Sequence, residues 1–443
     1  MATKIGMVSL GCPKNQVDAE IMLKKLSDAG YVITPDEADA EVIIINTCGF
    51  IEPAKAEAIE NIIEAARFKE DGTLRALIVT GCLAERYRDE ISKEIPEVDV
   101  VVGIGKNDDI VKIVEDALDG KFENQYGEKT DLTFEGERIL TTPPYTAYLK
   151  IAEGCDNCCT YCAIPLIRGP FRSRSVESIV DEAKRLSESG VTELILVAQD
   201  TTRYGEDISG GESLLPMLLE EVSKIDGIKW IRTLYTYPER ITDTLLSVIK
   251  ENEKVVPYLD IPLQHVNGEI LKRMNRKGDN KSLKKLINHI REVVPEITLR
   301  TTMLVGFPGE SEEDFSELCE FVKEMKFDRL GCFPYSEEEG TPAAEFDDQV
   351  DIQLRQDRAD NVMELQLRVV EEKMQEKIGT KQTVLIEGYD NYIRCYFGRS
   401  VADAPEIDGK IFFISPKPLK IGDYVNVRIN DTIDYDLLGE LED

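Results

Sequence analysis

The segment Glu153-Gly-Cys-Asp-Asn-Cys-Cys-Thr-Tyr-Cys-Ala-Ile-Pro165 places Cys155, Cys159 and Cys162 in one short loop. The loop directly follows a strand-like apolar run at Ala147–Ile151. Three thiolates at this spacing can bind three irons of a cubane cluster and leave the fourth iron open. An open coordination position is what chemistry at a metal centre requires, whereas a structural centre has its positions filled. The spacing therefore predicts a reactive iron–sulfur cluster held by these three cysteines.

Such a cluster can chelate the amino and carboxylate groups of S-adenosylmethionine, whose one-electron cleavage gives a 5′-deoxyadenosyl radical. Two other interpretations fit the loop less well. A structural zinc site usually has two cysteine pairs well separated in sequence, whereas the four cysteines here lie within eight residues. A bacterial ferredoxin uses Cys-x2-Cys-x2-Cys with a further Cys-Pro, which is a different spacing. The fourth cysteine, Cys158, does not fit the spacing of the three ligands and is interpreted as a residue that does not bind the cluster.

Outward from this loop, residues 145–350 alternate apolar runs with helical patterns, and residues 351–378 are predicted to form one long charged helix. Six such units predict a β/α barrel, complete or partial. We expect its strands at Ala147–Ile151, Thr192–Val197, Trp230–Tyr235, Val256–Ile261, Thr298–Val305 and Leu330–Tyr335.

Polar residues at or near the ends of these strands are candidate site residues, because barrel enzymes place their sites in the loops after the strands. Gln199 and Gln264 follow two strands, and Arg300 lies within a third. These three side chains can bind the polar groups of S-adenosylmethionine, although polar residues at strand ends often serve only as caps. His265 is by its position either a site residue or a structural histidine.

Residues 1–135 show the same alternation and are predicted to form a separate α/β domain with a parallel sheet. Cys12, Cys48 and Cys82 each directly follow a strand-like run. The carboxyl ends of parallel strands share one edge of a sheet, so these cysteines can converge and hold a second cubane. A single cysteine at such a place is more often a small buried hydrophobe. The same placement three times in succession favours a shared cluster.

The chain is strongly acidic, with 53 Lys and Arg against 85 Asp and Glu and a net charge of −32. Residues 378–443 contain short β-rich runs between turn glycines and predict a small closed β-barrel of roughly five strands. From Thr380 to Asp443 the sequence has seven basic and twelve acidic side chains. Nucleic-acid binding requires a basic footprint, so this barrel favours a basic protein partner over tRNA. The alternative is that the acidic balance only maintains solubility.

The cysteine and histidine content limits the possible chemistry further. The chain has ten cysteines and two histidines, which excludes histidine-rich metal sites. We expect a cytoplasmic protein without a membrane partner, because the apolar runs are strand-sized and the first residues are interpreted as a strand. The cytosol keeps thiols reduced, so clustered cysteines indicate metal binding. Cys319, Cys332 and Cys395 have no partner spacing and are assigned to packing.

Together these motifs resemble the methylthiotransferase family of radical S-adenosylmethionine enzymes over essentially the whole chain. The resemblance implies an α/β fold of three domains: an amino-terminal domain (1–135), a radical domain (141–375) and a terminal β-barrel of the TRAM type (378–443). It implies two 4Fe-4S clusters and S-adenosylmethionine as cofactors. In such a protein Cys12, Cys48 and Cys82 hold an auxiliary cluster that takes part in sulfur insertion, and Tyr161 flanks the adenine.

Two branches of this family differ in substrate: one modifies an adenosine in tRNA, and the other modifies an aspartate of the small-subunit ribosomal protein S-twelve. At the motif around Cys12 the tRNA branch typically has a Gln-Met-Asn version, and at the motif that ends in Cys155 it typically has Arg-Gly-Cys. One departure from the family is Ala19, where a serine is usual; a small residue still fits. Four segments resemble the ribosomal-protein branch: Ser9-Leu-Gly-Cys-Pro-Lys-Asn15 with Val17-Asp18, Ala152-Glu-Gly-Cys155, Leu259-Asp-Ile-Pro-Leu-Gln-His265 and Gly331-Cys-Phe-Pro-Tyr-Ser336.

The resemblance to this branch implies that one hydrogen on the β-carbon of that aspartate is replaced with a methylthio group. A radical is needed because this carbon–hydrogen bond is not activated for acid–base removal. One S-adenosylmethionine would supply the radical and another the methyl group, with electrons from a donor such as flavodoxin or ferredoxin. A tRNA-modifying enzyme and a non-catalytic iron–sulfur or zinc protein are the alternatives.

Overall fold

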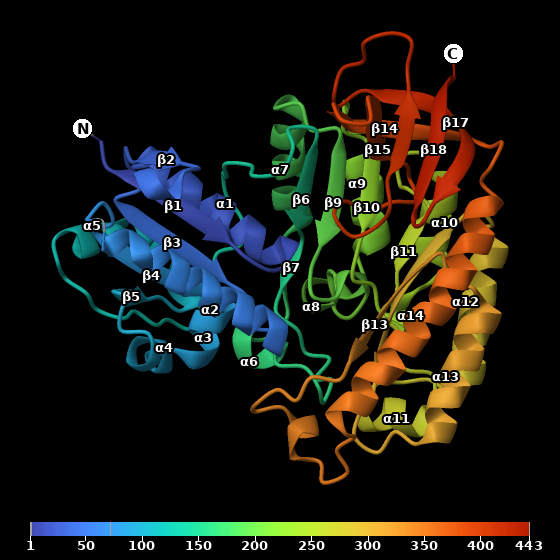
Figure 1. Ribbon diagram of the computed structural model, residues 1–443, viewed down its shortest axis with the longest axis horizontal. Coiled ribbons are helices and arrows are strands. Elements are labelled where there is room, and N and C mark those ends of the chain that lie inside the picture. The colour runs from blue at the N-terminus through green and yellow to red at the C-terminus, as the bar shows by residue number, and fades with distance from the viewer. Residues whose placement is uncertain (1, 71, 443) are drawn as a thin grey trace.

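The computed structural model describes residues 2–70 and 72–442 of the chain. Met1 and Asp443, at the outer ends of the first and third predicted domains, lie outside the described part, as does Asp71. The described chain is a mixed α/β fold with a five-stranded sheet, a central unit of parallel strands and a closed β-barrel (Figure 1). The predicted fold class is confirmed. Within the described residues, no helix has both the length and the apolar character needed to cross a bilayer.

The N-terminal unit, at the left of Figure 1, is a parallel sheet in the order β2-β1-β3-β4-β5. Apolar faces of α1 and α5 cover one side, and those of α2, α3 and α4 cover the other, so β3 and β4 are buried throughout. Its elements are β1 (Lys4–Ser9), α1 (Pro13–Asp28), β2 (Val32–Thr34), β3 (Val42–Thr47), α2 (Glu52–Ala66), β4 (Ala76–Gly81), α3 (Cys82–Tyr87), α4 (Asp89–Glu94), β5 (Val100–Val101) and α5 (Ile110–Leu118).

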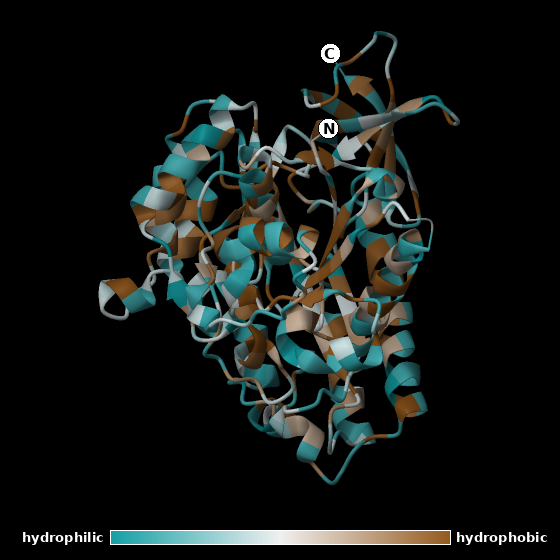
Figure 2. Cartoon of the chain, turned by 90° about the vertical axis from the view of Figure 1, so that its left-hand side faces the viewer, coloured by the Kyte–Doolittle hydropathy of each residue, from teal (hydrophilic) through white to brown (hydrophobic). Residues whose placement is uncertain are grey.

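The central unit is an open barrel of six parallel strands, with β6-β9-β10 and β11-β12-β13 joined by a bridge between Ile231 and Val255. Helices cover its outer face, and Figure 2 shows hydrophobic strands inside and hydrophilic outer surfaces on many of the helices. Its elements are β6 (Thr146–Lys150), β7 (Ala152–Glu153), α6 (Ile164–Arg168), β8 (Arg172–Ser173), α7 (Val176–Glu188), β9 (Glu193–Val197), α8 (Glu206–Ser209), α9 (Leu215–Ser223), β10 (Trp230–Thr233), α10 (Asp243–Glu251), β11 (Tyr258–Asp260), α11 (Gly268–Arg273), α12 (Asn280–Val293), β12 (Thr298–Val305), α13 (Glu312–Met325), β13 (Arg329–Pro334) and α14 (Ile352–Gln375).

The C-terminal unit is a closed five-stranded barrel in the order β14-β15-β16-β18-β17. Its core is joined by Val370 and Met374 of α14, so the long helix anchors the barrel to the central unit. The strands are β14 (Lys381–Asp390), β15 (Cys395–Arg399), β16 (Ile411–Ile414), β17 (Tyr424–Ile433) and β18 (Asp436–Glu442).

The C-terminal barrel closes the amino ends of the central strands through buried charge pairs. Arg399 donates to Glu193 at 2.6 Å, and Arg329 pairs with Asp403 at 2.6 Å. Trp230, at the start of β10, meets Tyr424 edge to face, with ring centroids 4.8 Å apart. The opposite, carboxyl ends of the strands stay free of this barrel, and they lie toward the bottom of Figure 1.

We expect Arg399→Met to lower the free energy of unfolding by about 3–5 kcal/mol at neutral pH, because Glu193 would stay buried without its main partner. Burial alone would raise the pKa of Glu193, but Arg399 and Arg232 hold it below its usual range. The ion pair therefore stabilises above the unfolded carboxyl pKa and is lost as pH falls through the folded pKa. Urea unfolding can be followed by the fluorescence of the single tryptophan, Trp230. The free energies of unfolding of Arg399→Met and of the unsubstituted protein should become equal as the pH is lowered.

The matched control is Arg185→Met on an exposed face of α7, which should change stability by less than about 0.5 kcal/mol. If the difference in free energy of unfolding between Arg399→Met and the unsubstituted protein stayed constant down to pH 3, the stabilising role of the Glu193–Arg399 ion pair would be contradicted.

Candidate active site

The cysteine loop leaves β6 and is closed at its base by the short antiparallel pair β7–β8. Cys155 N donates to Gly169 O at 3.1 Å across this base. Gly154 has a φ of +79°, and a Cβ built on it would lie 2.0 Å from Pro170 O, so only glycine fits. The glycine before the first cysteine is thus a requirement of the loop's closure.

The structure brings the three predicted radical-cluster thiols together. Cys159 interacts electrostatically with both Cys155 and Cys162, and Cys155 interacts with Cys162. Cys158 is exposed and stands apart from these interactions. Among the described residues, no three Cys, His, Asp or Glu side chains are placed to hold a single metal ion, which is the geometry of a zinc site. The donor set and its wider convergence fit a cluster.

Polar side chains from neighbouring loops fix the tip of the cysteine loop. Asn157 donates to Asp200 at 2.8 Å, and Asp200 in turn accepts from Arg240 at 3.1 Å. Asn275 donates to Cys158 O at 3.0 Å. Cys159 Sγ lies 3.3 Å from the hydroxyl of Tyr237. The loop conformation is therefore set by the ends of β9, β10 and α11 rather than by the loop alone.

The second predicted triad also converges. Cys12, Cys48 and Cys82 follow β1, β3 and β4, which are adjacent in the sheet, and each thiol interacts electrostatically with the other two. Gly11 has a φ of +89°, and a Cβ there would lie 2.9 Å from Cys48 Sγ. The triad sits where the strand order reverses between β1 and β3, the position at which open α/β sheets bind ligands.

Cations beside the second triad favour thiolates. Burial opposes ionisation of Cys12, yet Lys14 and Arg168 leave its pKa below the ordinary value. Burial raises the pKa of Cys82 to about 12, although Arg168 opposes this rise and donates to Cys82 Sγ at 3.2 Å. Thiolates are the form that binds iron, so these cations suit a cluster site.

A fully buried network of two cations and two carboxylates joins the two triads. Asp18 of α1 accepts from Lys150 at 2.6 Å and from Arg168 at 2.6 Å. Glu153, two residues before Cys155, also pairs with Lys150 and with Arg168. Burial raises the pKa of Glu153, but these two cations outweigh it and lower that pKa to about 2.

The network extends to the strand ends on both sides. Asn15 Oδ1 accepts from Arg168 at 2.9 Å, while Asn15 Nδ2 donates to Leu10 O at 2.8 Å and to Asn46 O at 3.3 Å. Cys82 packs against Ala163, which directly follows Cys162 in the chain, and against Ile167 of α6. The two cysteine triads therefore face each other across α6.

Of the predicted S-adenosylmethionine contacts, Gln199 and Tyr161 lie beside the cysteine loop. Gln199 Nε2 donates to Glu153 at 2.6 Å, and its Oε1 is buried without a hydrogen-bond partner among the described residues. That free acceptor suits an ammonium group. Tyr161 packs against the central core and interacts with Arg276, whose guanidinium lies over the Tyr237 ring.

Gln264 and Arg300 are placed differently. Gln264 has a φ of +70° and is held through its backbone, which bonds to Thr302 and Leu304, so its side chain remains half-buried at the strand end. Arg300 points into the barrel and pairs with Asp260 at 2.9 Å. It also approaches the C-terminal barrel, so its charge is already matched, and its contact with S-adenosylmethionine stays a prediction.

His265 is fully buried, and its Nδ1 accepts from Asn267 N at 3.0 Å. Its Nε2 lies 3.5 Å from a carboxylate oxygen of Glu310. These contacts fit the structural alternative for this histidine. Cys332 and Cys395 are buried and Cys319 packs against the central core, as expected of packing residues.

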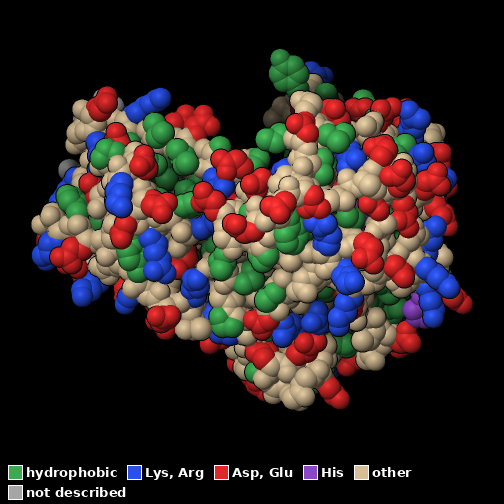
Figure 3. All heavy atoms as spheres, turned by 90° about the horizontal axis from the view of Figure 1, so that it is seen from below, with side chains coloured by type: hydrophobic (Ala, Val, Ile, Leu, Met, Phe, Trp, Pro, Cys, Tyr) green, Lys and Arg blue, Asp and Glu red, His purple; other side chains and the backbone are tan. Residues whose placement is uncertain are grey.

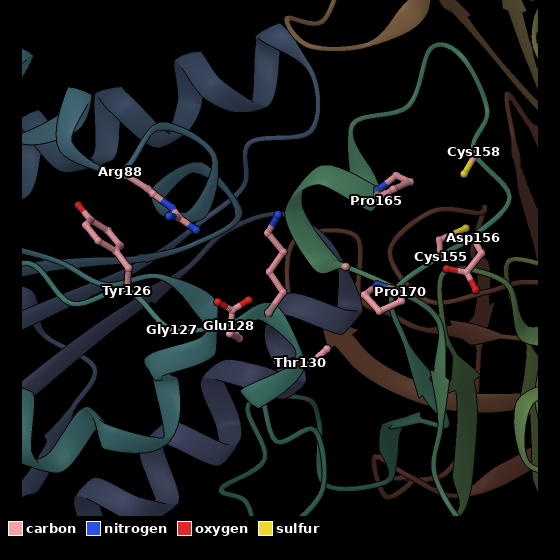
Figure 4. Close-up of a pocket in the computed structure, with 12 residues that line it drawn as sticks. Arg88, Tyr126, Gly127, Glu128, Thr130, Cys155, Asp156, Cys158, Pro165 and Pro170 are labelled. Carbon is pink, nitrogen blue, oxygen red and sulfur yellow. The ribbon is translucent and has the colours of Figure 1, made fainter.

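A cleft of about 780 Å³ opens beside the cysteine loop. In Figure 4, Arg88, Tyr126 and Glu128 lie on the N-terminal side of this cleft, and Cys155, Asp156 and Cys158 lie on the other side. Its lining is mostly polar and charged, which suits a protein segment better than an apolar ligand.

Four residues of the buried network were not predicted as site residues: Asp18, Lys150, Glu153 and Arg168. The available signal was a charge inside an apolar run, as at Lys150 at the end of a buried strand. Tyr237 and Asp200 were also missed, because their proximity to the cysteine loop arises only in the folded barrel.

The fold and this cysteine loop define a radical S-adenosylmethionine enzyme. The profile of the Radical SAM superfamily matches residues 149–322, Uncharacterized protein family UPF0004 matches residues 4–103, and the TRAM domain matches residues 378–441. Two solved structures of the radical S-adenosylmethionine methyltransferase TsrM from Kitasatospora setae share the fold, at TM-scores of 0.55 and 0.57 and 14% and 12% identity. They cover 77% and 88% of this chain, which covers 77% and 79% of theirs. Radical S-adenosylmethionine enzymes use S-adenosylmethionine and a 4Fe-4S cluster.

Full-length relatives narrow this class. The chain is 50% identical to ribosomal protein uS12 methylthiotransferase RimO of Desulforamulus reducens, over 99% of each chain. It is 49% identical to the protein of the same name from Acetivibrio thermocellus, over 100% of this chain and 99% of the relative. The chain belongs to the ribosomal protein uS12 methylthiotransferase family, and the predicted family resemblance is confirmed.

We expect Arg168→Met to destabilise the contact between the N-terminal and central units by about 3–5 kcal/mol, because Asp18 and Glu153 would share one remaining cation, Lys150. Thermal unfolding combined with hydrogen exchange should show faster exchange in α1 and α6. Arg168→Lys keeps the charge but has fewer hydrogen-bond donors, so its stability should lie between those of Arg168→Met and the unsubstituted protein. Arg185→Met is the exposed control, and a melting curve of Arg168→Met that matches this control would show that the network is dispensable.

Proposed function

We propose that this enzyme attaches a methylthio group to the β-carbon of an aspartate of ribosomal protein uS12, using two 4Fe-4S clusters. The observation that carries the proposal is the facing of two three-cysteine sites across α6, joined by Arg168. One site would serve radical generation and the other sulfur insertion. The name shared by the full-length relatives supports the substrate.

The chain's own residues would hold each group in place. Cys155, Cys159 and Cys162 would bind one cluster, and Cys12, Cys48 and Cys82 the other. Gln199 Oε1 would accept from the ammonium of S-adenosylmethionine, with Glu153 fixing the amide through Nε2. When bound, these cofactors supply a radical for hydrogen abstraction, a sulfur atom and a methyl group.

The cleft and the acidic surface suit a basic protein substrate. The cleft reaches Cys155 and is lined by polar backbone and charged side chains, so an extended loop can approach the radical site. The C-terminal barrel has an excess of acidic side chains, which would attract a basic ribosomal protein and repel tRNA. The tRNA-modifying alternative is therefore not favoured.

The reaction also needs a reductant and a reducing compartment. We propose a one-electron donor such as flavodoxin or ferredoxin, and a cytoplasmic location. Ten free cysteines, six of them in the two triads, fit the cytosol because it keeps thiols reduced.

Iron content tests the two ligand sets. The reconstituted protein should bind about eight irons per chain, as two four-iron clusters require, and no zinc. Replacing Cys155, Cys159 and Cys162 together with Ala should remove about half of this iron, and so should replacing Cys12, Cys48 and Cys82. The control is Cys158→Ala, which should keep the full content. Stoichiometric zinc, or a loss of iron in Cys158→Ala as large as in a triad variant, would refute the assignment.

Mass spectrometry tests the substrate. In cells that lack this protein, uS12 should lose the mass increment of a methylthio group, and the gene for the unsubstituted enzyme should restore it. The Cys155, Cys159 and Cys162 triple variant should not restore it, whereas Cys158→Ala should. If uS12 kept the increment while a tRNA adenosine lost its own, the enzyme would belong to the tRNA branch in function.

A further inference from the structure

One segment of this acidic chain is strongly basic. From Gly268 to Val293, which spans α11 and α12, the sequence has eight Lys and Arg against three Asp and Glu. The whole chain has the opposite balance, with a net charge of −32. The segment is therefore a local reversal of charge and not part of a general trend.

Several cations of this segment face solvent without a close ion pair, although Asp279 interacts electrostatically with Lys281. Lys277, Lys281 and Lys285 are exposed, and no described carboxylate lies within ion-pair distance of them. Lys272 is exposed as well, with a side chain 79% accessible and only a loose contact of 3.9 Å to Glu269. We call Lys272, Lys277, Lys281 and Lys285 the lysine face.

The other cations of the segment are engaged internally. Arg273 forms a two-point pair with Asp348 at 2.6 and 2.8 Å, and Lys284 pairs with Glu324. Arg276 is buried against Tyr237 and donates to Pro262 O. Carboxylates near the lysine face thus neutralise neighbours, while the lysine face keeps its own charge available to a partner.

The lysine face adjoins the radical cysteine loop through direct hydrogen bonds. Thr160 bonds to Met274 O at 3.1 Å through its N–H and to Arg273 O at 2.8 Å through its hydroxyl. Asn275 donates to the carbonyls of Asn157 and Cys158. Cys158 itself is exposed. The basic segment is therefore contiguous with the accessible tip of the loop that would hold the radical cluster.

Figure 3 views the molecule from below, onto the carboxyl ends of the central strands. Lys and Arg side chains gather between the centre of this face and its right-hand side, where one histidine is visible. Of the two histidines only His289 is accessible, so this histidine marks α12. Acidic side chains prevail at the upper right of this view, and the left-hand side shows both signs of charge.

We propose that the lysine face is the docking surface for an acidic one-electron carrier protein that reduces the radical site. The proposal rests on the proposed function, which requires such a reductant. In each electron transfer, the reduced carrier loses one electron and the enzyme's radical site gains it, and no atom is transferred. Charge complementarity would steer the carrier to the lysine face, next to the exposed Cys158 at the tip of the cysteine loop.

Ribosomal RNA is the competing partner for a basic surface near a ribosomal-protein enzyme. The position of the lysine face favours the electron carrier, because the same segment hydrogen-bonds the radical loop directly. The cleft that suits the substrate also reaches Cys158, but it extends from the loop toward Arg88 and Tyr126, and none of the four lysines lines it.

The test uses the reconstituted full-length enzyme and photoreduced flavodoxin under anaerobic conditions. Stopped-flow absorbance follows flavodoxin oxidation, which reports electron transfer independently of product formation. At low salt, K277E/K281E should lower the second-order rate constant by at least about tenfold and flatten its salt dependence, because attraction becomes repulsion. K277Q/K281Q should give an intermediate loss.

The matched control is K112E/K250E, which makes the same charge change at two exposed lysines of α5 and α10, away from the lysine face. It should change the rate constant by less than about twofold. Equal losses in the two glutamate pairs would overturn the docking site. So would unchanged electron transfer in K277E/K281E, above all if that variant lost binding to small-subunit ribosomal RNA.

Dithionite, a small reductant that needs no docking protein, separates this inference from the proposed function. All variants should form 5′-deoxyadenosine from S-adenosylmethionine with dithionite at the rate of the unsubstituted enzyme. Failure of the unsubstituted enzyme to form it would overturn the proposed function. Normal yields with dithionite, together with flavodoxin rates that do not differ among the variants, would overturn the docking site alone.

Discussion

The guanidinium of Arg168 is the interaction on which the arrangement of this enzyme depends. It is fully buried, and such a charge is tolerated only where opposite charges and acceptors surround it. Asp18 and Asn15 supply them from α1, and Glu153 supplies them from the base of the cysteine loop. Because one planar group with five donors satisfies all of these partners, small displacements of either unit would leave buried carboxylates unpaired. The network therefore fixes the distance between the two cysteine triads.

Buried ion pairs also join two units at the other end of the central barrel. There, buried ion pairs of Glu193 with Arg399 and of Asp403 with Arg329 bind the C-terminal barrel to the amino ends of the strands. Both contacts between units are thus charged at their centres and apolar around them. Such contacts are poor sources of net stability compared with a well-packed apolar core, but they admit few alternative registers. Rigid placement is what a site with two triads requires.

The central strands and the close approach of Cys155, Cys159 and Cys162 could be predicted from the sequence, because both signals are local. Strands such as Ala76–Gly81 are continuous apolar runs, and the spacing of Cys155, Cys159 and Cys162 lies within one loop. The short edge strand Val32–Thr34 has little buried face and so gives no comparable pattern. The separation of α3 from α4 at Arg88, where φ is +40°, has no sequence signal either. The buried network escaped detection because its partners are 132 and 150 residues apart. No periodicity reports which distant charges will meet.

The charge of this protein is distributed unevenly over its surface. A protein with a net charge of −32 attracts a basic substrate over most of its surface but repels an acidic reductant. A local reversal of sign would let both of the proposed partners approach one active site. The lysine face lies on α11, on α12 and on the turn between them, beside the tip of the cysteine loop, while the cleft proposed for the substrate extends from that loop toward the N-terminal unit. Electrons and substrate would then arrive from different directions, so a bound substrate would not have to leave before the radical site is reduced again.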